Sequence, residues 1–332
     1  MAQIVGSFGV PHNPHFYGMS QLDDARGQEI CRLYGEIERR LAALRPDAIV
    51  FVTSDHYNIF FEECIPIFSV GVAESAWGPS DYSSMPFVEV PLHAALAHQL
   101  HADVVAADFD VAMSQEFVLD HTVISPLLLL TRALDVPVVP VFVNGLIRPL
   151  ASSRRCFALG RAIRAAIERS PLPLRVAVMA SGSFSLEIGG PRISDRAHFG
   201  VPDPAWTDRV LALLSAGEFE ALVEEAGDAQ LRRAGNAGGE LLDWIVMLGV
   251  TDARAPDFLQ AQPEYGHAYG AWPAEPGDPT SAPGGPGGPG APGAPGAPGA
   301  DHGRKGGSER QNHPSGHDQR SAGDEPGEGG RP

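Results

Sequence analysis

The sequence predicts an α/β fold, a sandwich of helices around a mostly buried, mixed β-sheet. Short runs rich in β-branched residues alternate with helical patterns along residues 1–272, as in folds whose strands are connected by helices. The chain has 332 residues and is 43% hydrophobic, so it can bury a sizeable core. We therefore expect a single catalytic or binding domain over residues 1–272 and a separate tail over residues 273–332.

The order of the elements follows from the periodicity of the hydrophobic residues. Strands are expected where apolar and β-branched residues run together, at residues 3–10, 48–53, 65–72, 109–113, 136–144 and 175–180. Helices are expected at residues 22–44, 91–101, 125–134, 152–170, 205–216 and 240–248. Ligands in such folds gather at strand ends, so the loops that follow strands are the places to expect a site.

The composition changes abruptly near Pro273. From there on, roughly half of the residues are Gly or Pro, above the quarter to a third that marks low complexity. The short Gly-Ala-Pro repeats within 287–300 are too few for a collagen helix. Such a segment cannot bury enough apolar surface to offset its ordering entropy, so we expect a disordered tail.

Charge and cysteine content exclude several classes of protein. The net charge of -17 argues against nucleic acid and anionic membranes as partners. Cys31, Cys64 and Cys156 show no paired spacing, which indicates a reducing compartment. The N-terminus lacks the pattern of a signal peptide, and no apolar run is long enough to span a membrane. We expect a cytoplasmic protein, and also a homo-oligomer.

Three residues on separate segments have the chemistry of a metal site. His12 follows the first predicted strand, His56 follows the second, and Glu240 opens a late helix. Two histidines and one carboxylate form the facial triad of non-haem Fe(II) enzymes, which leaves one face of the metal open. Each residue alone has an ordinary alternative, because loop histidines often lie on the surface and a glutamate suits a helix start.

The wider sequence resembles a known family. The chain is similar, over about residues 3–272, to the class III extradiol ring-cleavage dioxygenases, typified by the catalytic subunit of protocatechuate 4,5-dioxygenase. The motifs that carry the resemblance are the loop 9–12 with Pro14, Ser54-Asp55-His56 with the run 65–71, Asp120-His121 with Pro126, the helical segment 155–166, Gly189-Gly190-Pro191-Arg192, and Gly239-Glu240-Leu241-Leu242-Asp243-Trp244.

The resemblance implies a cofactor, a substrate and a reaction. It implies ferrous iron, Fe(2+), held by His12, His56 and Glu240, with His121 as an acid–base residue. It implies a small catecholic or related ortho-substituted aromatic substrate and O2, with cleavage of the ring next to the diol, in aromatic catabolism. Some members of the family need a separate small subunit, which the sequence of this chain does not reveal.

One position departs from the family pattern. Leu186 stands where the family has a second acid–base histidine, shortly before the Gly-Pro-Arg segment. Leucine cannot transfer a proton, and such catalysis typically contributes about 10²–10⁴-fold. Three explanations stay open: His121 carries both roles, a neighbouring group substitutes, or the substrate needs no second base. The neighbouring groups considered are His15, Glu187 and His198.

Two further residues and two other functions remain as alternatives. Arg192 is expected either to pair with a substrate carboxylate or to hold its own turn. Tyr269 is expected either to line the substrate pocket or to pack in the core. Leu186 also fits a non-catalytic metal-binding or interaction protein on the same scaffold. The same ligand trio fits a zinc-dependent hydrolase.

Overall fold

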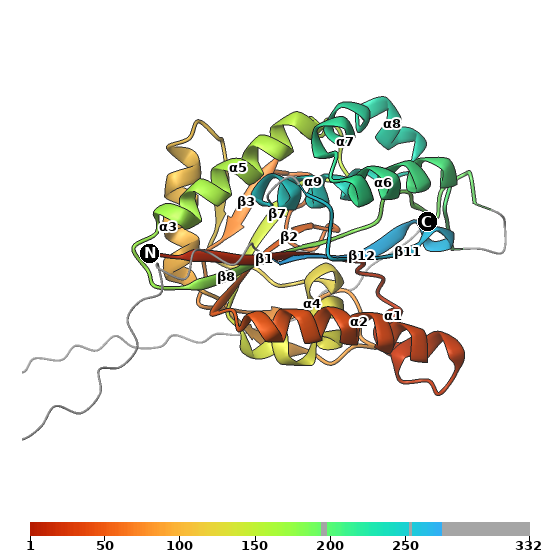
Figure 1. The fold of residues 1–332 in the computed structure, drawn as a ribbon, viewed down its shortest axis with the longest axis horizontal. Helices are drawn as coiled ribbons and strands as arrows, with labels where there is room; N and C mark the ends of the chain where they lie inside the picture. The colour runs from red at the N-terminus through yellow and green to blue at the C-terminus, as the bar shows by residue number, and fades with distance from the viewer. Residues whose placement is uncertain (194–197, 252–253, 274–332) are drawn as a thin grey trace, which may run out of the picture. The chain divides into compact units, whose positions relative to one another are not determined.

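The computed structural model describes residues 1–193, 198–251 and 254–273, and the expected tail from residue 274 on lies outside them. It confirms the α/β fold, since an eight-stranded sheet in the order β11-β12-β1-β8-β2-β7-β3-β6 lies between two layers of helices (Figure 1). The strands of this sheet are β1 (Gln3–Val10), β2 (Ala48–Ser54), β3 (Phe68–Gly71), β6 (Ala112–Ser114), β7 (Val138–Val143), β8 (Arg175–Ser181), β11 (Phe258–Gln262) and β12 (His267–Pro273).

The sheet is mixed, with a parallel centre. Strands β1, β8, β2 and β7 are parallel neighbours, whereas β12 pairs antiparallel with β1 and β3 pairs antiparallel with β7. The central strands β2 and β7 are buried along their whole length. Parallel strands covered on both faces need continuous apolar runs, which explains why the sequence pattern identified them.

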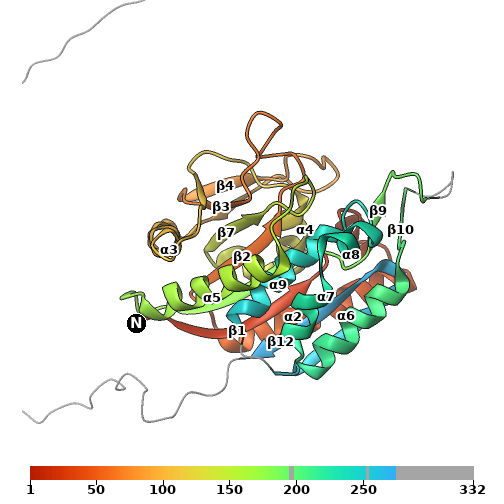
Figure 2. The same cartoon turned by 90° about the horizontal axis from the view of Figure 1, so that it is seen from above.

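One layer of helices covers the upper face of the sheet in Figure 1 and the other layer covers the lower face. The upper layer consists of α3 (Ala94–Val105), α5 (Ser153–Arg169), α6 (Pro204–Ala216), α7 (Phe219–Glu225), α8 (Asp228–Arg233) and α9 (Leu241–Val250). The lower layer consists of α1 (Phe16–Ser20), α2 (Ala25–Leu44) and α4 (His121–Leu129). Figure 2 shows α5 running along α9 above the sheet.

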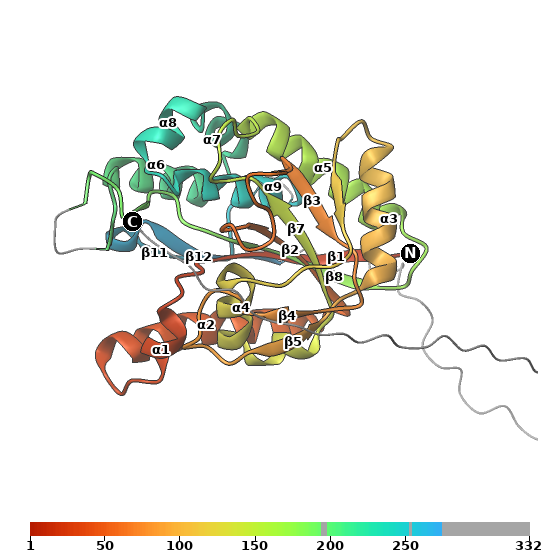
Figure 3. The ribbon, with the colours of Figure 1, turned by 180° about the vertical axis from the view of Figure 1, so that it is seen from behind.

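The remaining elements are short. The hairpin of β4 (Ser75–Gly78) and β5 (Val88–Pro91) lies beside α4 in the lower layer (Figure 3). A second small pair joins β9 (Glu187–Ile188) to β10 (Phe199–Gly200). Three 3₁₀ turns complete the fold, η1 (Thr131–Asp135), η2 (Gly238–Glu240) and η3 (Pro263–Tyr265).

Each layer of helices makes its own hydrophobic core with the sheet. The upper core joins α3, α5, α6, α7 and α9 to one face, and the lower core joins α2 and α4 to the other. Glycine allows the closest approach in the upper layer, because a Cβ on Gly160 of α5 would lie 2.0 Å from the Val246 oxygen of α9. The two layers leave the loops at the carboxyl ends of the parallel strands free to form a site.

The expected helix start at residue 125 was four residues late and the last two strands of the sheet were not expected from the sequence. Helix α4 begins at His121, where Asp120 accepts a hydrogen bond from the Thr122 N–H and so caps the helix. Strands β11 and β12 contain few β-branched residues, and β11 lies at the edge of the sheet. The pairing of β12 with β1, and of β11 with β12, is a tertiary event that no local periodicity reveals.

Candidate metal centre

The three sequence-predicted ligand residues lie together at the carboxyl edge of the sheet. His12 follows β1, His56 follows β2, and these strands flank β8 in the sheet. The nearest Glu240 carboxylate oxygens lie 3.4 Å from His12 Nε2 and 3.3 Å from His56 Nε2. Segments far apart in the sequence therefore place two imidazoles around one carboxylate.

These side chains keep one atom each unpaired. His12 Nε2, His56 Nε2 and Glu240 Oε1 are buried and have no hydrogen-bond partner. Their other polar atoms are held: His12 Nδ1 is 3.0 Å from Ser181 Oγ, and Glu240 Oε2 accepts a hydrogen bond of 2.8 Å from the Ser183 N–H. Buried polar atoms are normally satisfied, so three unpaired ones that converge are the signature expected of a cation site.

The electrostatics of the cluster suit a cation. Burial favours the neutral form of the Glu240 carboxyl, but the adjacent imidazoles outweigh it and lower the pKa well below its usual range. Burial lowers the pKa of His12, whereas at His56 the adjacent Glu240 outweighs burial and raises the pKa. Glu240 is thus a buried carboxylate, completely shielded from solvent, and its charge calls for a positive partner.

His121 lies beside the same cluster. Its ring centroid is 4.8 Å from that of His56 and 5.7 Å from that of His12. One ring nitrogen from each of His12, His56 and His121 lies within 4.8 Å of the others. His121 differs from His12 and His56 at its other ring nitrogen, Nδ1, which pairs with the carboxylate of Asp81. His121 is therefore close to a bound cation but also has a fixed hydrogen-bond partner of its own.

Two aspartates hold the loops that carry His56 and His121. Asp120 accepts hydrogen bonds from the backbone N–H of His56, at 3.0 Å, and of Thr122. Asp55 accepts from three successive backbone N–H groups, those of Asn58, Ile59 and Phe60, at 3.1, 3.0 and 3.0 Å. Local carboxylate–backbone bonds of this kind fix a turn without regular structure. The loop after β2 is thereby held in a single conformation, with His56 facing Glu240.

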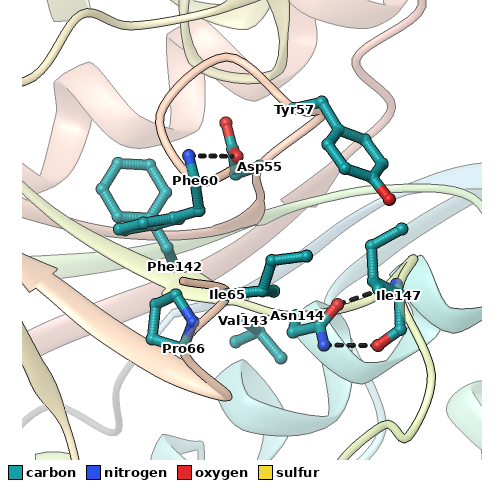
Figure 4. A pocket seen from close by; sticks show the side chains of 9 residues that line it. All are labelled: Asp55, Tyr57, Phe60, Ile65, Pro66, Phe142, Val143, Asn144 and Ile147. Atoms are coloured by element: carbon teal, nitrogen blue, oxygen red, sulfur yellow. Dashed lines mark hydrogen bonds between the residues drawn. The ribbon is translucent and has the colours of Figure 1, made fainter. Parts of the chain in front are cut away.

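A small pocket lies next to this loop. Figure 4 shows it between the Asp55 turn and the end of β7, lined by apolar side chains such as Phe60 and Phe142. Its volume is about 20 Å³, which holds little more than one water molecule. We assign no substrate to it.

A larger cavity opens directly on the cluster of His12, His56 and Glu240. Its volume is about 310 Å³, in the range of small-ligand sites. Its walls combine the cluster with polar and apolar side chains from several loops: His12, Asn13, Pro14, His15, His56, Tyr82, His121, Ser183, Leu186, Ile188, His198, Phe199, Glu240, Tyr265 and His267. The cavity therefore offers an aromatic-sized space with the cluster in its wall.

The structure separates the groups that were considered as replacements for a histidine at Leu186. Leu186 itself lines the cavity, as do His15 and His198, which are both exposed. Glu187 is buried and points elsewhere, because it forms a 2.5 Å ion pair with Arg192 and accepts the Asn236 N–H. Glu187 is therefore removed from the set of candidate bases.

The alternatives left open for Arg192 and Tyr269 are also resolved. Besides Glu187, Arg192 binds the backbone carbonyls of Arg233 and Arg232, at 2.6 and 3.3 Å, so it holds its turn against α8. Tyr269 is fully buried and packs edge-to-face on Tyr34, at 5.2 Å between centroids. Both residues stabilise the fold and neither lines the cavity.

Three site residues were missed by the sequence reasoning. Asp81 and Tyr82 lie after the β4 hairpin strand, and Tyr82 packs edge-to-face on His121 at 5.0 Å. His267 is the first residue of β12, far along the chain from the other two, and it also lines the cavity. No local motif marks these residues. The one signal in the sequence for His267 is its place in the aromatic run 265–272.

Comparison with known proteins shows the family. The family described as the catalytic LigB subunit of aromatic ring-opening dioxygenase matches residues 6–272. The chain belongs to this family. The LigB family comprises class III extradiol enzymes, as the sequence motifs indicated. The match ends one residue before Pro273, close to where the composition changes.

Individual relatives in the LigB family are moderately similar. The 2,3-dihydroxyphenylpropionate/2,3-dihydroxicinnamic acid 1,2-dioxygenase of Paraburkholderia xenovorans is 32% identical over 286 residues, covering 73% of this chain and 89% of the relative. The enzyme of the same name from Cupriavidus necator is 30% identical over 289 residues, covering 74% and 91%.

A solved structure shares the fold. An uncharacterized protein of Escherichia coli K12 superposes with a TM-score of 0.52 at 17% sequence identity, covering 81% of this chain and 98% of that one. At this identity the similarity concerns the fold alone. Among the helices that the structure describes, none is both long and apolar enough to cross a membrane.

Proposed function

We propose that this protein is an Fe(II)-dependent extradiol dioxygenase that cleaves a catecholic or related ortho-substituted aromatic ring next to its diol. The observation that carries the proposal is the set of three unpaired buried atoms, His12 Nε2, His56 Nε2 and Glu240 Oε1, beside a cavity of about 310 Å³. Membership of the LigB family supports it. The catecholic substrates in the names of the curated relatives make this substrate class the first to test.

The donor set fits ferrous iron. Two imidazoles and one carboxylate, from three separate segments, match the 2-His-1-carboxylate triad of non-haem Fe(II) enzymes. His12, His56 and Glu240 would hold the ion, and Ser181 and Ser183 orient two of these ligands from behind. When bound, the iron supplies the redox chemistry for O2 and a positive charge that favours a deprotonated phenol.

His121 is suited to be the proton acceptor. Because a carboxylate accepts hydrogen bonds, its pairing with Asp81 places the ring proton on Nδ1 and leaves Nε2 as the free basic nitrogen. His121 lines the cavity beside His12 and His56, within reach of a phenolic hydroxyl directed at the cluster. We assign to it the removal of a phenolic proton from the substrate and the later return of a proton to the opening ring.

The remaining walls position an aromatic ring. Leu186, Pro14, Phe199 and Tyr265 contribute apolar or aromatic surface to the cavity, and Tyr82 packs against the ring of His121. Apolar walls displace water from a flat ring and hold it against the polar cluster. In this arrangement Leu186 belongs to the ring-binding wall, and His121 carries the acid–base role alone.

We further propose that residues 1–272 are the catalytic unit and that the protein works in a reducing compartment, the cytoplasm. The family match over residues 6–272 supports the first statement. Cys31 and Cys64 are free and exposed, and Cys156 is free and buried, which supports the second.

The test is iron content and O2 uptake of the full-length protein, measured with a panel that contains protocatechuate and 2,3-dihydroxyphenylpropionate. We expect iron-dependent O2 uptake and a yellow ring-opened product from at least one catechol. His121→Phe should keep its iron and lose about 10²–10⁴-fold in turnover. His98→Gln, on the exposed face of α3, is the matched control and should behave as the wild type.

Three results would contradict the proposal. Zinc in the isolated protein, with hydrolytic activity that iron does not support, would favour the hydrolase. Tight iron binding without O2 uptake across the panel would favour a non-catalytic relative. Full turnover in His121→Phe would remove His121 as the base and leave His15 and His198 to be examined.

A further inference from the structure

His267 is a buried imidazole in the cavity wall that the proposed mechanism does not use. It is 2% exposed and lines the cavity. It opens β12, and its partner in the antiparallel ladder is Gln262, the last residue of β11. The hairpin therefore ends in a fixed pair of side chains, with His267 Nε2 2.8 Å from Gln262 Oε1.

This pair determines which ring nitrogen is free. An amide oxygen only accepts hydrogen bonds, so Nε2 carries the proton and donates it to Gln262. Nδ1 is then a bare acceptor. Among the described residues, the hydrogen bond of the His267 ring is the one at Nε2, and the residue lines the cavity. Burial, with the nearby His12, lowers the pKa of His267 to about 3, so the imidazole stays neutral.

The ring is held in place on several sides. Tyr265 stacks on it with centroids 5.7 Å apart, and Phe16 and Tyr269 meet it edge-on at 5.6 and 6.0 Å. By contrast, His15 and His198, the cavity histidines to which the proposed mechanism also gives no role, are exposed. A fixed acceptor selects its partner by geometry, whereas an exposed side chain does not.

The turn that carries His267 is bonded to the segment that carries Leu186. The carbonyl of Gly266 accepts hydrogen bonds from the Phe184 and Ser185 N–H groups, at 2.7 and 3.4 Å. Gly266 adopts a φ of 74°, a left-handed conformation that favours glycine. The wall that is apolar at Leu186 is thus joined directly to a wall with a hydrogen-bond acceptor.

We propose that His267 Nδ1 accepts a hydrogen bond from a hydroxyl of the aromatic substrate outside the diol and selects substrates that carry this hydroxyl. The proposal rests on the proposed function, because it takes a hydroxylated ring as the occupant of the cavity. A buried acceptor left without its donor is costly, so such a site discriminates against analogues that lack the hydroxyl.

Two substitutions separate the two ring nitrogens. His267→Asn places an amide near the position of Nδ1, and His267→Gln places one near the position of Nε2. Both remove the ring that stacks on Tyr265, so a purely structural role predicts equal effects. The probes are pyrogallol, which carries a hydroxyl beside the diol, and catechol, which lacks it. Each is added anaerobically to the full-length Fe(II)-loaded protein, and its Kd is measured by calorimetry.

We expect His267→Gln to raise the Kd for pyrogallol about tenfold, the effect of one good hydrogen bond, and to change the Kd for catechol less than about threefold. His267→Asn should stay within about threefold of the wild type for both probes. Iron content should be unchanged in both, since His267 is not a proposed ligand. His98→Gln should match the wild type. Equal losses in the Asn and Gln variants, or no loss in either, would overturn the proposal.

A second readout does not depend on iron. In metal-free protein labelled with 15N-histidine, NMR should show His267 as a neutral imidazole with its proton on Nε2 from pH 5 to 8. A proton on Nδ1 would overturn the proposal. Wild-type protein that binds pyrogallol more tightly than catechol, without O2 uptake, would contradict the proposed function alone, and a wild type that binds neither probe would contradict both.

Discussion

Asp81 holds His121 at two points. Its Oδ1 accepts the His121 backbone N–H at 3.0 Å, and its Oδ2 pairs with the ring Nδ1. The first bond fixes the start of α4 and the second fixes the tautomer and rotation of the imidazole. One carboxylate, from a loop far from His121 in sequence, therefore determines how the proposed base faces the cavity.

Asp81→Asn tests this relationship. The asparagine amide can still accept the backbone N–H of His121, but it forms a poorer hydrogen bond with the ring Nδ1 than the carboxylate does. The negative charge of Asp81 is also removed. We expect kcat to fall about ten- to hundredfold while iron content stays constant. The measurement is the pH profile of kcat together with 15N-histidine NMR of the His121 tautomer. A drop in KM alone, with kcat and tautomer unchanged, would show that Asp81 does not act through His121.

Removing Fe(II) should lower the Tm only in protein that keeps His12, His56 and Glu240. A ligand that binds the folded state alone stabilises it by about 2.7 kcal/mol at a concentration of 100 times its Kd. We expect excess Fe(II) to raise the Tm of the wild type and EDTA to reverse the change. His12→Ala, His56→Ala and Glu240→Ala should each lose this response. A variant that keeps the full iron-dependent shift is not a ligand.

Leu186→His tests the departure from the family pattern. The backbone of Leu186 is held by bonds of 2.8 and 3.1 Å to Ala234 and Ala237, so a new side chain should project into the cavity as leucine does. We expect higher turnover of protocatechuate and 2,3-dihydroxyphenylpropionate. Leu186→Asn, which is polar but is not a base, is the control. Lower turnover in both variants would show that the apolar wall itself is required.

Asp243 predicts a pH dependence of stability. Burial raises the pKa of the Asp243 carboxyl well above its usual range, and Ser54 donates a 2.9 Å hydrogen bond to its Oδ2. Because the folded pKa exceeds the unfolded one, the stability contributed by the protonated carboxyl is complete below about pH 4 and is lost as the pH rises through the folded pKa. Each pKa unit corresponds to about 1.4 kcal/mol.

Asp243→Asn keeps an acceptor for Ser54 and cannot ionise. The free energy of unfolding is measured in urea with EDTA. The value for Asp243→Asn minus the value for the wild type should therefore increase as the pH rises from 4 to 8. Asp110→Asn, on the surface, is the control and should differ little from the wild type at any pH. A constant difference between Asp243→Asn and the wild type would contradict the assignment.

The contact between α5 and α9 predicts a steric effect. A Cβ at Gly160 would lie 2.0 Å from the Val246 oxygen and 2.8 Å from the Gly249 Cα, and backbone atoms cannot move aside cheaply. We expect Gly160→Ala to destabilise the protein by about 1–3 kcal/mol in urea unfolding. Gly35→Ala is the matched control, because that helical glycine has nothing within 4 Å, and it should be neutral or stabilising. Equal effects of the two substitutions would exclude the steric explanation.

The sequence by itself determined the α/β class and the strands of the parallel centre. Strands such as β2 and β7 are buried on both faces, so their apolar runs are visible without any tertiary information. It also placed His12 and His56 after strands and Glu240 at a helix start, which is where the structure brings them together. The family motifs lie in these same local segments.

Only the tertiary structure decided which distant side chains complete the site. Asp81 holds His121 from a hairpin loop, and His267 lines the cavity from the strand β12. Their partners His121 and Gln262 are set by packing and strand register. Glu187 and Arg192 are removed from the site by their ion pair with each other. A local pattern records how a segment is buried, whereas contacts between segments depend on how the whole chain closes around its core.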